Sequence, residues 1–319
     1  MPKISIILPT YNVESYIERA LQSCINQTFK DIEIIVVDDC GNDKSIEIAK
    51  EYAKKDNRVK IVYNEKNLGT FASRNIGVLN SNSPYIMFLD PDDYLELNAC
   101  EAGFDLLKED KDLIVFNYKT EMENVGLIDY SFRDKNLNLD LKQFLFFIVT
   151  HLNFTIFNPI FNKIYKKDLY LNSLKMYFKN YKRISMAEDV LANCLYLANT
   201  KNICLTNQAL YCYAFNPCSI TREKKDTQRI KNSVDDLIYV EKEIATFFQG
   251  LNKDYFYFFQ LVICNLNIHK IDLIYKYLTK NFLKKLMLKI KRKMVKIKMK
   301  KYIKLAKNIL KEKNVSSSL

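Results

Sequence analysis

The sequence predicts an α/β fold, in which a mostly parallel, Rossmann-like sheet carries helices on both faces and a helical, basic C-terminal extension follows. Apolar runs of strand length alternate four times with segments of helical apolar spacing between residues 3 and 117. The run from Ile32 to Val37 is mostly β-branched, as expected for a strand buried on both faces of a parallel sheet. Beyond Arg222 the composition changes to a helical pattern rich in Phe, Tyr, Leu and Ile. Strand–helix alternation of this kind implies a parallel sheet between two layers of helices.

The elements expected in the first 117 residues are short and closely connected. Asn12 or Ser15 would cap the first helix, and turn residues such as Asn67 and Gly69 separate later elements. Strands are expected at 3–8, 32–37, 59–63, 85–89 and 113–117, and helices at 13–27, 44–55, 70–80 and 95–108.

The pattern is looser in the following hundred residues. We expect a polar loop or excursion at 122–138, a short apolar helix at 141–150, and a mixed turn and basic segment at 158–168. An apolar helical run opens at Glu188-Asp189, and 203–213 has the pattern of a strand. We therefore divide the chain into three predicted regions: 1–117, 118–222 and 223–319.

Bulk composition is that of a globular soluble or peripheral protein. Of the 319 residues 48% are hydrophobic and 27% charged. The eight cysteines show no C-x-x-C spacing and there are only two histidines, so we expect reduced thiols in the cytoplasm and no zinc site. The N-terminus lacks the features of a secretory signal, and no apolar run reaches the ~18 residues needed to span a bilayer. We expect a chain that is not secreted through an N-terminal signal and does not cross a membrane.

The positive charge is concentrated near the C-terminus. The segment from Lys280 to Lys313 contains fifteen Lys or Arg and one acid, Glu312, so its net charge is about +14. Since the whole chain has a net charge of +12, the remaining residues sum to about −2. A basic amphipathic helix favours reversible binding to the inner face of the cytoplasmic membrane. Nucleic-acid binding is disfavoured because it needs no apolar stripe, and a solvated helix packed on the body is the other alternative. The predicted stripe consists of Leu283, Met287, Ile290, Met294, Ile297, Met299, Tyr302, Leu305, Ala306 and Ile309.

Three acids, Asp90, Asp92 and Asp93, crowd the end of the predicted strand at 85–89. Close carboxylates repel one another and need a counter-ion, and Mg²⁺ commonly uses one or two carboxylates plus substrate phosphates. The simpler alternative is an acidic turn in which Asp93 caps the next helix.

Two more polar clusters, Pro9–Asn12 and Asp38–Asp39, follow other predicted strands. Ligands of open parallel sheets bind at this edge, which favours the functional interpretation of the acids. A dinucleotide-binding turn and a P-loop are both absent, so phosphate charge would be met by a metal and by cations such as Arg74.

These residues resemble the family 2 glycosyltransferases, which adopt the GT-A fold. The resemblance covers about residues 3–222, and within it the first hundred residues are most similar to bacterial lipooligosaccharide β-1,3-galactosyltransferases of the Campylobacter and Helicobacter type. The matching motifs are P-T-Y-N at 9–12, V-D-D at 37–39, N-L-G at 67–69, S-R-N-I-G at 73–77, L-D-P-D-D at 89–93, A-E-D at 187–189 and, more weakly, S-I-T-R at 219–222.

The resemblance implies a UDP-sugar donor, a divalent cation (Mn²⁺ or Mg²⁺) and inversion at the anomeric carbon. It assigns Pro9, Tyr11 and Asp39 to the uridine, with Asp39 accepting the uracil N–H. Simpler structural roles remain open: Pro9 as a strand terminator and Asp39 as a turn cap.

The same resemblance assigns Asn67, Gly69 and Arg74 to the nucleotide and its phosphates. Asp92 would be a direct metal ligand, and Asp90 would contact ribose or metal. Arg74 could instead form an ion pair on a helix surface.

On the acceptor side, Asp189 aligns with the catalytic base and Glu188 with a residue near the acceptor. The alternative is that both acids simply favour the positive end of a helix dipole. The chain departs from the family in lacking a tryptophan at 154–168, where Phe154 and Phe157 stand, and a histidine before Ser219.

The implied function is transfer of a hexose, with galactose first, to a lipooligosaccharide or other surface-glycan acceptor. Transfer of N-acetylhexosamine or glucose is the alternative, and an inactive membrane-docked scaffold is a further one. A nucleotidyltransferase would need a Gly-rich basic loop near the N-terminus, which the sequence lacks.

Overall fold

The computed structural model describes residues 1–108, 110–122, 126–129, 136–151, 157–178, 182–216, 226–248 and 253–311. The chain forms two compact units. The sheet unit comprises 1–139, 159–183 and 198–219, and the helical unit comprises 140–158, 184–197 and 220–319. The predicted regions 1–117, 118–222 and 223–319 stay a prediction.

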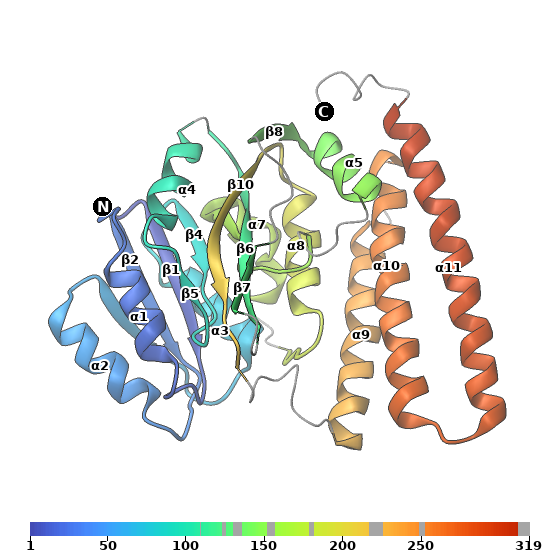
Figure 1. The fold of residues 1–319 in the computed structure, drawn as a ribbon, viewed down its shortest axis with the longest axis horizontal. Helices are drawn as coiled ribbons and strands as arrows, with labels where there is room; N and C mark the ends of the chain where they lie inside the picture. Colours follow the sequence, from blue (N-terminus) through green and yellow to red (C-terminus); the bar gives the residue numbers. More distant parts are fainter. Residues whose placement is uncertain are drawn as a thin grey trace. The chain divides into compact units, whose positions relative to one another are not determined.

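The described residues of the sheet unit form a ten-stranded sheet of order β3-β2-β1-β4-β9-β6-β10-β5, with β7 on β6 and β8 on β10 (Figure 1). Neighbours β1–β2, β2–β3, β1–β4 and β6–β10 are parallel, whereas β4–β9, β6–β9, β6–β7 and β5–β10 are antiparallel. The predicted α/β architecture is confirmed, and the part of the sheet from β3 to β4 is parallel as predicted, but the sheet as a whole is mixed. The strands are β1 Ile4–Thr10, β2 Ile32–Asp38, β3 Val59–Tyr63, β4 Tyr85–Phe88, β5 Tyr94–Leu95, β6 Leu113–Met122, β7 Gly126–Asp129, β8 Leu137–Asp140, β9 Lys163–Lys166 and β10 Asn202–Tyr213.

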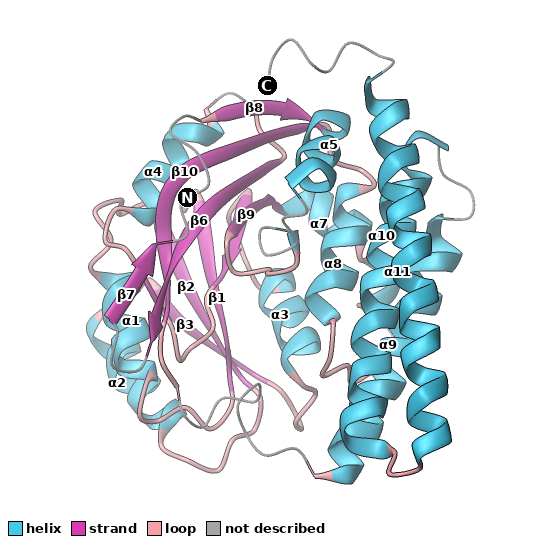
Figure 2. Ribbon diagram, turned by 45° about the vertical axis from the view of Figure 1, so that its right-hand side comes forward, coloured by secondary structure: helices cyan, strands magenta, loops and turns pink. Residues whose placement is uncertain are grey.

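Helices cover both faces of this sheet (Figure 2). One face packs on the apolar sides of α1 (Ile17–Ile25), α2 (Ser45–Lys55) and α4 (Ala99–Leu107). The other face carries α3 (Thr70–Leu79) and α7 (Lys167–Ser173), followed by the 3₁₀ turn η1 (Lys175–Tyr177).

Helix α3 approaches the sheet closely. A Cβ on Gly77 would lie 2.4 Å from Cγ2 of Ile7 in β1, so only glycine allows this spacing. The close approach brings the first turn of α3 to the carboxyl edge of the central strands.

Several elements differ from the sequence prediction. The segment predicted as a turn and basic stretch contains β9, which pairs antiparallel with both β4 and β6. The helix expected from residue 95 begins at Ala99 because Tyr94–Leu95 pair with β10. The first helix begins at Ile17 after Tyr16, so the predicted caps Asn12 and Ser15 are wrong.

The helical unit confirms the predicted helical, basic C-terminal region. In it α10 packs against both α9 and α11, and α5 packs against α11 (Figure 1). Among the residues that the structure describes, no helix is both long and apolar enough to cross a membrane. The elements are α5 Leu141–His151, α8 Glu188–Leu197, α9 Thr227–Phe247, α10 Lys253–Leu273, the π-helical turn η3 Ile274–Leu278 and α11 Phe282–Lys311.

Candidate functional site

The polar clusters that end β1, β2 and β4 lie at one edge of the sheet, as the sequence predicts. β1 pairs with β2 so that Thr10 is opposite Asp38, and the Asp39 N–H donates to the Thr10 carbonyl at 3.0 Å. On the other side of β1, the Leu89 N–H donates to the Ile7 carbonyl at 3.0 Å. The chain order reverses here, since β2 and β3 lie on one side of β1 and β4 on the other. Such a switch point is where open α/β sheets bind ligands.

Pro9 and Tyr11 lie at the carboxyl end of β1. Pro9 is buried and pairs with Val37, whereas the Tyr11 side chain is 45% exposed and can meet a ligand. Asn12 adopts a left-handed φ of 51°, and its Oδ1 accepts a hydrogen bond from the Asn42 N–H at 2.7 Å. This bond ties the loop after β1 to the loop after β2.

Asp39 anchors the loop that follows β3. Its Oδ1 accepts hydrogen bonds from the Leu68 N–H at 2.7 Å and from Asn64 Nδ2 at 2.8 Å, and its Oδ2 accepts from the Gly69 N–H at 2.9 Å. The carboxyl is buried, and each oxygen of a carboxylate can accept two hydrogen bonds. Oδ2 therefore keeps capacity for one further donor, so the geometry is compatible with both the turn-cap and the uracil-binding interpretations.

Gly69 occupies the position just before α3, with φ at 86°. An L side chain there would be strained, and its Cβ would also meet Cγ of Arg183 at 3.2 Å. Asn67 lies two residues earlier, and its buried Oδ1 has no hydrogen-bond partner among the described residues. The Leu68 and Gly69 amides already donate to Asp39, so the loop presents one unsatisfied acceptor beside the N-terminus of a ten-residue helix, an end that favours anions.

Arg74 projects from α3 toward the acidic turn. Its Nη2 donates to Asp90 Oδ1 at 2.7 Å, and its guanidinium lies 5.9 Å from the centre of the Phe88 ring. The Arg74 side chain is only 4% exposed, so the alternative of an ion pair on a helix surface is wrong: the pair is buried on the arginine side. A charge-assisted bond in such surroundings is stronger than an exposed one.

Asp92 is held by a neutral partner. Its Oδ2 accepts from Asn216 Nδ2 at 2.9 Å, and Asn216 Oδ1 accepts from the Tyr16 hydroxyl at 3.0 Å. Arg19 Nη2 donates to the Asp92 backbone carbonyl at 2.8 Å. Burial raises the pKa of the Asp92 carboxyl, and the neighbouring Asp90 carboxylate raises it further.

Asp93 has its hydrogen-bond partners on β10 and directly after it. Its Oδ2 accepts from the Tyr211 hydroxyl at 2.5 Å and its Oδ1 from the Ala214 N–H at 2.8 Å. The alternative in which Asp93 caps the next helix is therefore wrong, because its partners are on and just after β10. Burial raises the pKa of Asp93 well above its usual value, with Asp92 and Asp90 adding to the effect.

The Asp90–Asp92 pair has the chemistry of a site for a hard divalent cation. Both offer carboxylate oxygens, which suit Mg²⁺ and Mn²⁺. Asp92 forms no ion pair with any described residue, and the positive charge of Arg19 only partly opposes the rise in its pKa. The described residues hold no cluster of three or more His, Cys, Asp or Glu placed to bind a metal. The donor set fits a cation that takes its remaining ligands from substrate phosphates.

Glu188 and Asp189 belong to the helical unit and open α8. They are half-buried in its first turn, directly after Ala187, whose φ of 64° is left-handed. The Ser185 N–H donates to the buried carboxylate of Asp236 at 2.8 Å, which fixes the chain just before this turn. This position suits an acid on electrostatic grounds alone, so the catalytic role of Asp189 and the acceptor role of Glu188 stay predictions.

Four residues of this region were missed by the sequence analysis: Arg19, Asn64, Tyr211 and Asn216. Asn64 directly follows β3, so its place at a strand end was an available signal. The other three reach the acidic turn only through tertiary contacts. Ser219–Arg222 and Phe154, which the sequence analysis singled out, lie outside the described residues.

Residues 5–169 match the model of glycosyl transferase family 2. The chain belongs to this family. It is 42% identical over 125 residues to the putative glycosyltransferase EpsH of Bacillus subtilis, covering 39% of this chain and 36% of EpsH. It is 31% identical over 192 residues to the GalNAc(5)-diNAcBac-PP-undecaprenol beta-1,3-glucosyltransferase of Campylobacter jejuni, covering 58% of this chain and 62% of the relative.

Among solved structures, the fold is similar to S. aureus TarS (residues 1–349) in complex with UDP-GlcNAc, with a TM-score of 0.67. The sequence identity is 20%, and the match covers 97% of this chain and 91% of that one. It confirms the predicted GT-A type of fold. The chain spans less than two thirds of the length of the curated relatives EpsH and the Campylobacter enzyme.

Proposed function

We propose that this chain is an inverting glycosyltransferase that moves a hexose from a UDP-sugar to a saccharide acceptor of lipooligosaccharide or another surface glycan. The observation that carries the proposal is the arrangement of Asp39, Arg74, Asp90 and Asp92 at the switch point of a family 2 sheet. A UDP-sugar donor is supported by the structure of TarS with UDP-GlcNAc.

In this proposal the nucleotide lies along the edge of β1 and β2. Pro9 and exposed Tyr11 would pack on the uracil, and the remaining lone pair of Asp39 Oδ2 would accept its N–H. The unsatisfied Asn67 Oδ1 would accept a hydrogen bond from a ribose hydroxyl, and the N-terminus of α3, directly after Gly69, would face the nearest phosphate.

The diphosphate would be bound by Arg74 and by a metal ion on Asp90 and Asp92. Asp92 would hold the Mn²⁺ or Mg²⁺ with Asp90 as its partner, and the ion would act as a Lewis acid toward the diphosphate leaving group. Arg74 keeps a positive charge beside the same phosphates while its ion pair orients Asp90. Asn216 keeps the Asp92 carboxylate in place without neutralising it.

Asp189 would accept the proton of the acceptor hydroxyl as that hydroxyl attacks the anomeric carbon, and Glu188 would contact the acceptor. A general base typically contributes ~10²–10⁴-fold to the rate. A single catalytic carboxylate suffices for inversion, so no covalent sugar intermediate is required.

Galactose is the first candidate sugar, on the resemblance of the N-terminal hundred residues to lipooligosaccharide galactosyltransferases. Glucose is a specific second candidate because the Campylobacter relative carries the name of a beta-1,3-glucosyltransferase. N-Acetylhexosamine is a third, given the UDP-GlcNAc bound to TarS. We place the reaction at the inner face of the cytoplasmic membrane, because the C-terminal helix is strongly basic.

The test is a screen of UDP-sugars for Mn²⁺- or Mg²⁺-dependent release of UDP, with and without a truncated lipooligosaccharide acceptor. Asp189→Asn should abolish transfer and retain UDP binding, whereas Asp92→Ala should lose metal-dependent donor binding. Asp31→Asn is the matched control, since Asp31 is exposed just before β2. Turnover by Asp189→Asn at the wild-type rate, or an unchanged metal titration of Asp92→Ala, would refute the respective assignments.

A further inference from the structure

Helix α11 carries two apolar faces, whereas packing in the helical unit accounts for only one. Its inner face contacts α10 and α5: Ala306 is buried, Leu288 and Val295 are half-buried, and the Tyr302 ring lies 5.9 Å from that of Tyr257 in α10. Arg292 on the same side forms an ion pair with Asp272 at 2.6 Å. A helix on the surface of a bundle needs one apolar stripe, so the second requires another explanation.

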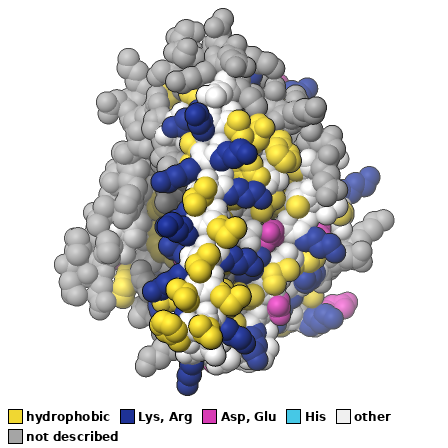
Figure 3. Space-filling model, turned by 90° about the vertical axis from the view of Figure 1, so that its right-hand side faces the viewer, with side chains coloured by type: hydrophobic (Ala, Val, Ile, Leu, Met, Phe, Trp, Pro, Cys, Tyr) yellow, Lys and Arg dark blue, Asp and Glu magenta, His cyan; other side chains and the backbone are white. Residues whose placement is uncertain are grey.

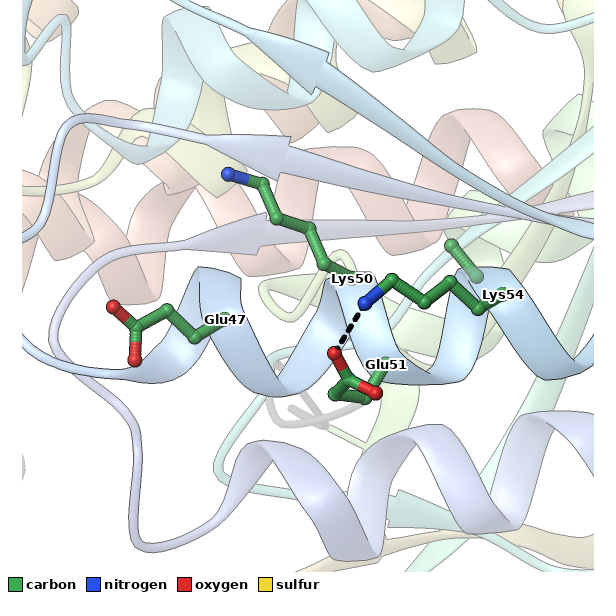
Figure 4. A pocket seen from close by; sticks show the side chains of 5 residues that line it. Glu47, Lys50, Glu51 and Lys54 are labelled. Atoms are coloured by element: carbon green, nitrogen blue, oxygen red, sulfur yellow. Dashed lines mark hydrogen bonds and ion pairs between the residues drawn. The ribbon is translucent and has the colours of Figure 1, made fainter.

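The second face is a row of exposed apolar side chains, which we call the outer ridge. Successive residues of a helix are about 100° apart, so all but Phe282 of these side chains fall within an arc of about 100°. The first to last positions span about 22 Å along the helix. Figure 3 shows hydrophobic side chains gathered along the exposed side of this helix. The ridge consists of Phe282, Leu283, Leu286, Met287, Ile290, Met294 and Ile297, with exposed fractions of 45% to 77%.

This geometry corrects the single stripe predicted from the sequence. Met299, Tyr302, Leu305 and Ala306 do not continue the row that starts at Leu283, because they are half-buried or buried. Met299, Tyr302 and Ala306 belong to the inner face. Leu305 lies about five turns beyond Met287 on the same side of the helix, but unlike Met287 it is half-buried. The side chain of Ile309 lies outside the described residues.

Cations border the outer ridge on both sides (Figure 3). Helical spacing puts Lys284 and Lys291 along one border and Lys293 and Lys300 along the other, and none of the four forms an ion pair with a described residue. The whole helix contains thirteen Lys or Arg and no acid. The ridge and its borders together make a surface that is apolar in the middle and positive at the edges.

We propose that the outer ridge of α11 inserts into the surface of an anionic lipid bilayer, with the helix axis parallel to the membrane plane. Apolar residues would enter the headgroup and acyl boundary while the bordering lysines contact lipid phosphates, which is the binding mode of interfacial amphipathic helices. A second copy of the chain is a poorer occupant because the lysines that border one ridge would face those that border the other. Nucleic acid would contact the bordering lysines through its phosphates but would leave the apolar side chains of the ridge exposed to water. This inference deepens the proposed function by naming the surface that brings the enzyme to its acceptor.

The chain contains no tryptophan, so one introduced tryptophan reports on its own position. In Met287→Trp the emission should shift to shorter wavelength on addition of vesicles of phosphatidylcholine with phosphatidylglycerol, and brominated acyl chains should quench it. Met176→Trp is the matched control, because Met176 is 59% exposed in the sheet unit, and its emission should not change. An unchanged spectrum of Met287→Trp with these vesicles would overturn the proposal.

Two further variants separate the apolar and the electrostatic contributions in vesicle co-sedimentation. Met287→Ser/Ile290→Ser/Met294→Ser should raise the lipid concentration for half-maximal binding roughly tenfold or more, because burial of each such side chain favours the bound state. Lys291→Gln/Lys293→Gln/Lys300→Gln should weaken binding to anionic vesicles only, and salt should weaken the wild type in the same way. Equal binding by the triple serine variant, or a dimer in solution that the serine variant abolishes, would contradict the lipid assignment.

The outcome is independent of catalysis. All variants should retain wild-type turnover of UDP-sugar with a soluble acceptor in detergent, which also shows that they fold. Loss of vesicle binding with turnover intact supports the ridge as the membrane contact. Vesicle binding by a chain without transferase activity would instead refute the proposed function and leave the membrane contact standing.

Discussion

Glu33, at the amino end of the sheet, allows a quantitative prediction about the stability of the scaffold. Its carboxylate is buried between β1, β2 and the turn before β4. It accepts hydrogen bonds from Ser5 Oγ at 2.6 Å, the Asn82 N–H at 2.5 Å and Lys60 Nζ at 2.7 Å. Burial alone would raise the pKa of Glu33, but these bonds outweigh it and lower the pKa from 4.5 to about 2.

The size of the effect follows from linkage. One pKa unit corresponds to about 1.4 kcal/mol, so the lowered pKa of Glu33 contributes about 3 kcal/mol to the free energy of unfolding at pH 7. Because the folded pKa is the lower one, this contribution is complete above about pH 5 and is lost as the pH falls toward 2. At pH 3 about 1 kcal/mol should remain.

The assay is urea unfolding of wild type and Glu33→Gln, followed by circular dichroism at pH 7 and at pH 3. The variant should be less stable by about 3 kcal/mol at pH 7 and by about 1 kcal/mol at pH 3. Glu65→Gln is the control, since Glu65 is exposed and has no hydrogen bond or ion pair among the described residues. A difference for Glu33→Gln that does not depend on pH would refute the assignment of stability to the ionised carboxylate.

Two predictions concern the supports of the acidic turn. Tyr211→Phe removes the hydroxyl that donates to Asp93 and accepts from the Asp90 N–H at 3.3 Å. This variant should lower the free energy of unfolding by roughly 1–3 kcal/mol and raise the KM for the donor. The control Tyr63→Phe, at an exposed ring, should change neither quantity. Arg74→Lys keeps the positive charge but loses the planar guanidinium beside Asp90 and Phe88. We expect this variant to bind UDP more weakly than the wild type in calorimetry. Equal affinity of the variant and the wild type for UDP would show that charge alone matters at this position.

The sequence predicted the features that depend on local pattern. The alternating strands and helices from Ile4 to Leu107 follow the change between two periodicities, and Asp39 and Asp90 lie at strand ends because polar residues end apolar runs. Strand β9 was missed because it is four residues long and contains two lysines, and its place in the sheet comes from pairing with distant strands. The partner of Asp93 was missed for the same reason, since Tyr211 is 118 residues away.

Which apolar face of α11 is covered was also beyond the sequence analysis. Leu283 and Met299 both fit a spacing of three and four residues, and only the packing of α10 determines which of them is covered. Local periodicity shows that a helix has apolar faces; the neighbours of the helix decide which face is available to a partner.

Asn216 is the residue through which the scaffold controls the chemistry of Asp92. Asp92 is desolvated and adjacent to Asp90, and it receives a hydrogen bond from a neutral amide whose orientation the Tyr16 hydroxyl fixes. Such a partner orients a metal ligand without competing for its charge, and loss of partners of this kind typically weakens metal affinity by roughly 10–100-fold. Asn216→Ala should therefore shift the Mn²⁺ titration of UDP binding by roughly that factor, and Tyr16→Phe should shift it less in the same direction.

Calorimetric titration of Mn²⁺ in the presence of UDP measures this shift directly. The unfolding midpoints of the variants control for structural damage, because Asn216 is itself buried. If Asn216→Ala binds Mn²⁺ and UDP as the wild type does, Asp92 needs no orientation by the amide. A larger effect of Tyr16→Phe than of Asn216→Ala would contradict the order of the chain from Tyr16 through Asn216 to Asp92, because a residue that acts through another cannot contribute more to this titration than the residue it positions.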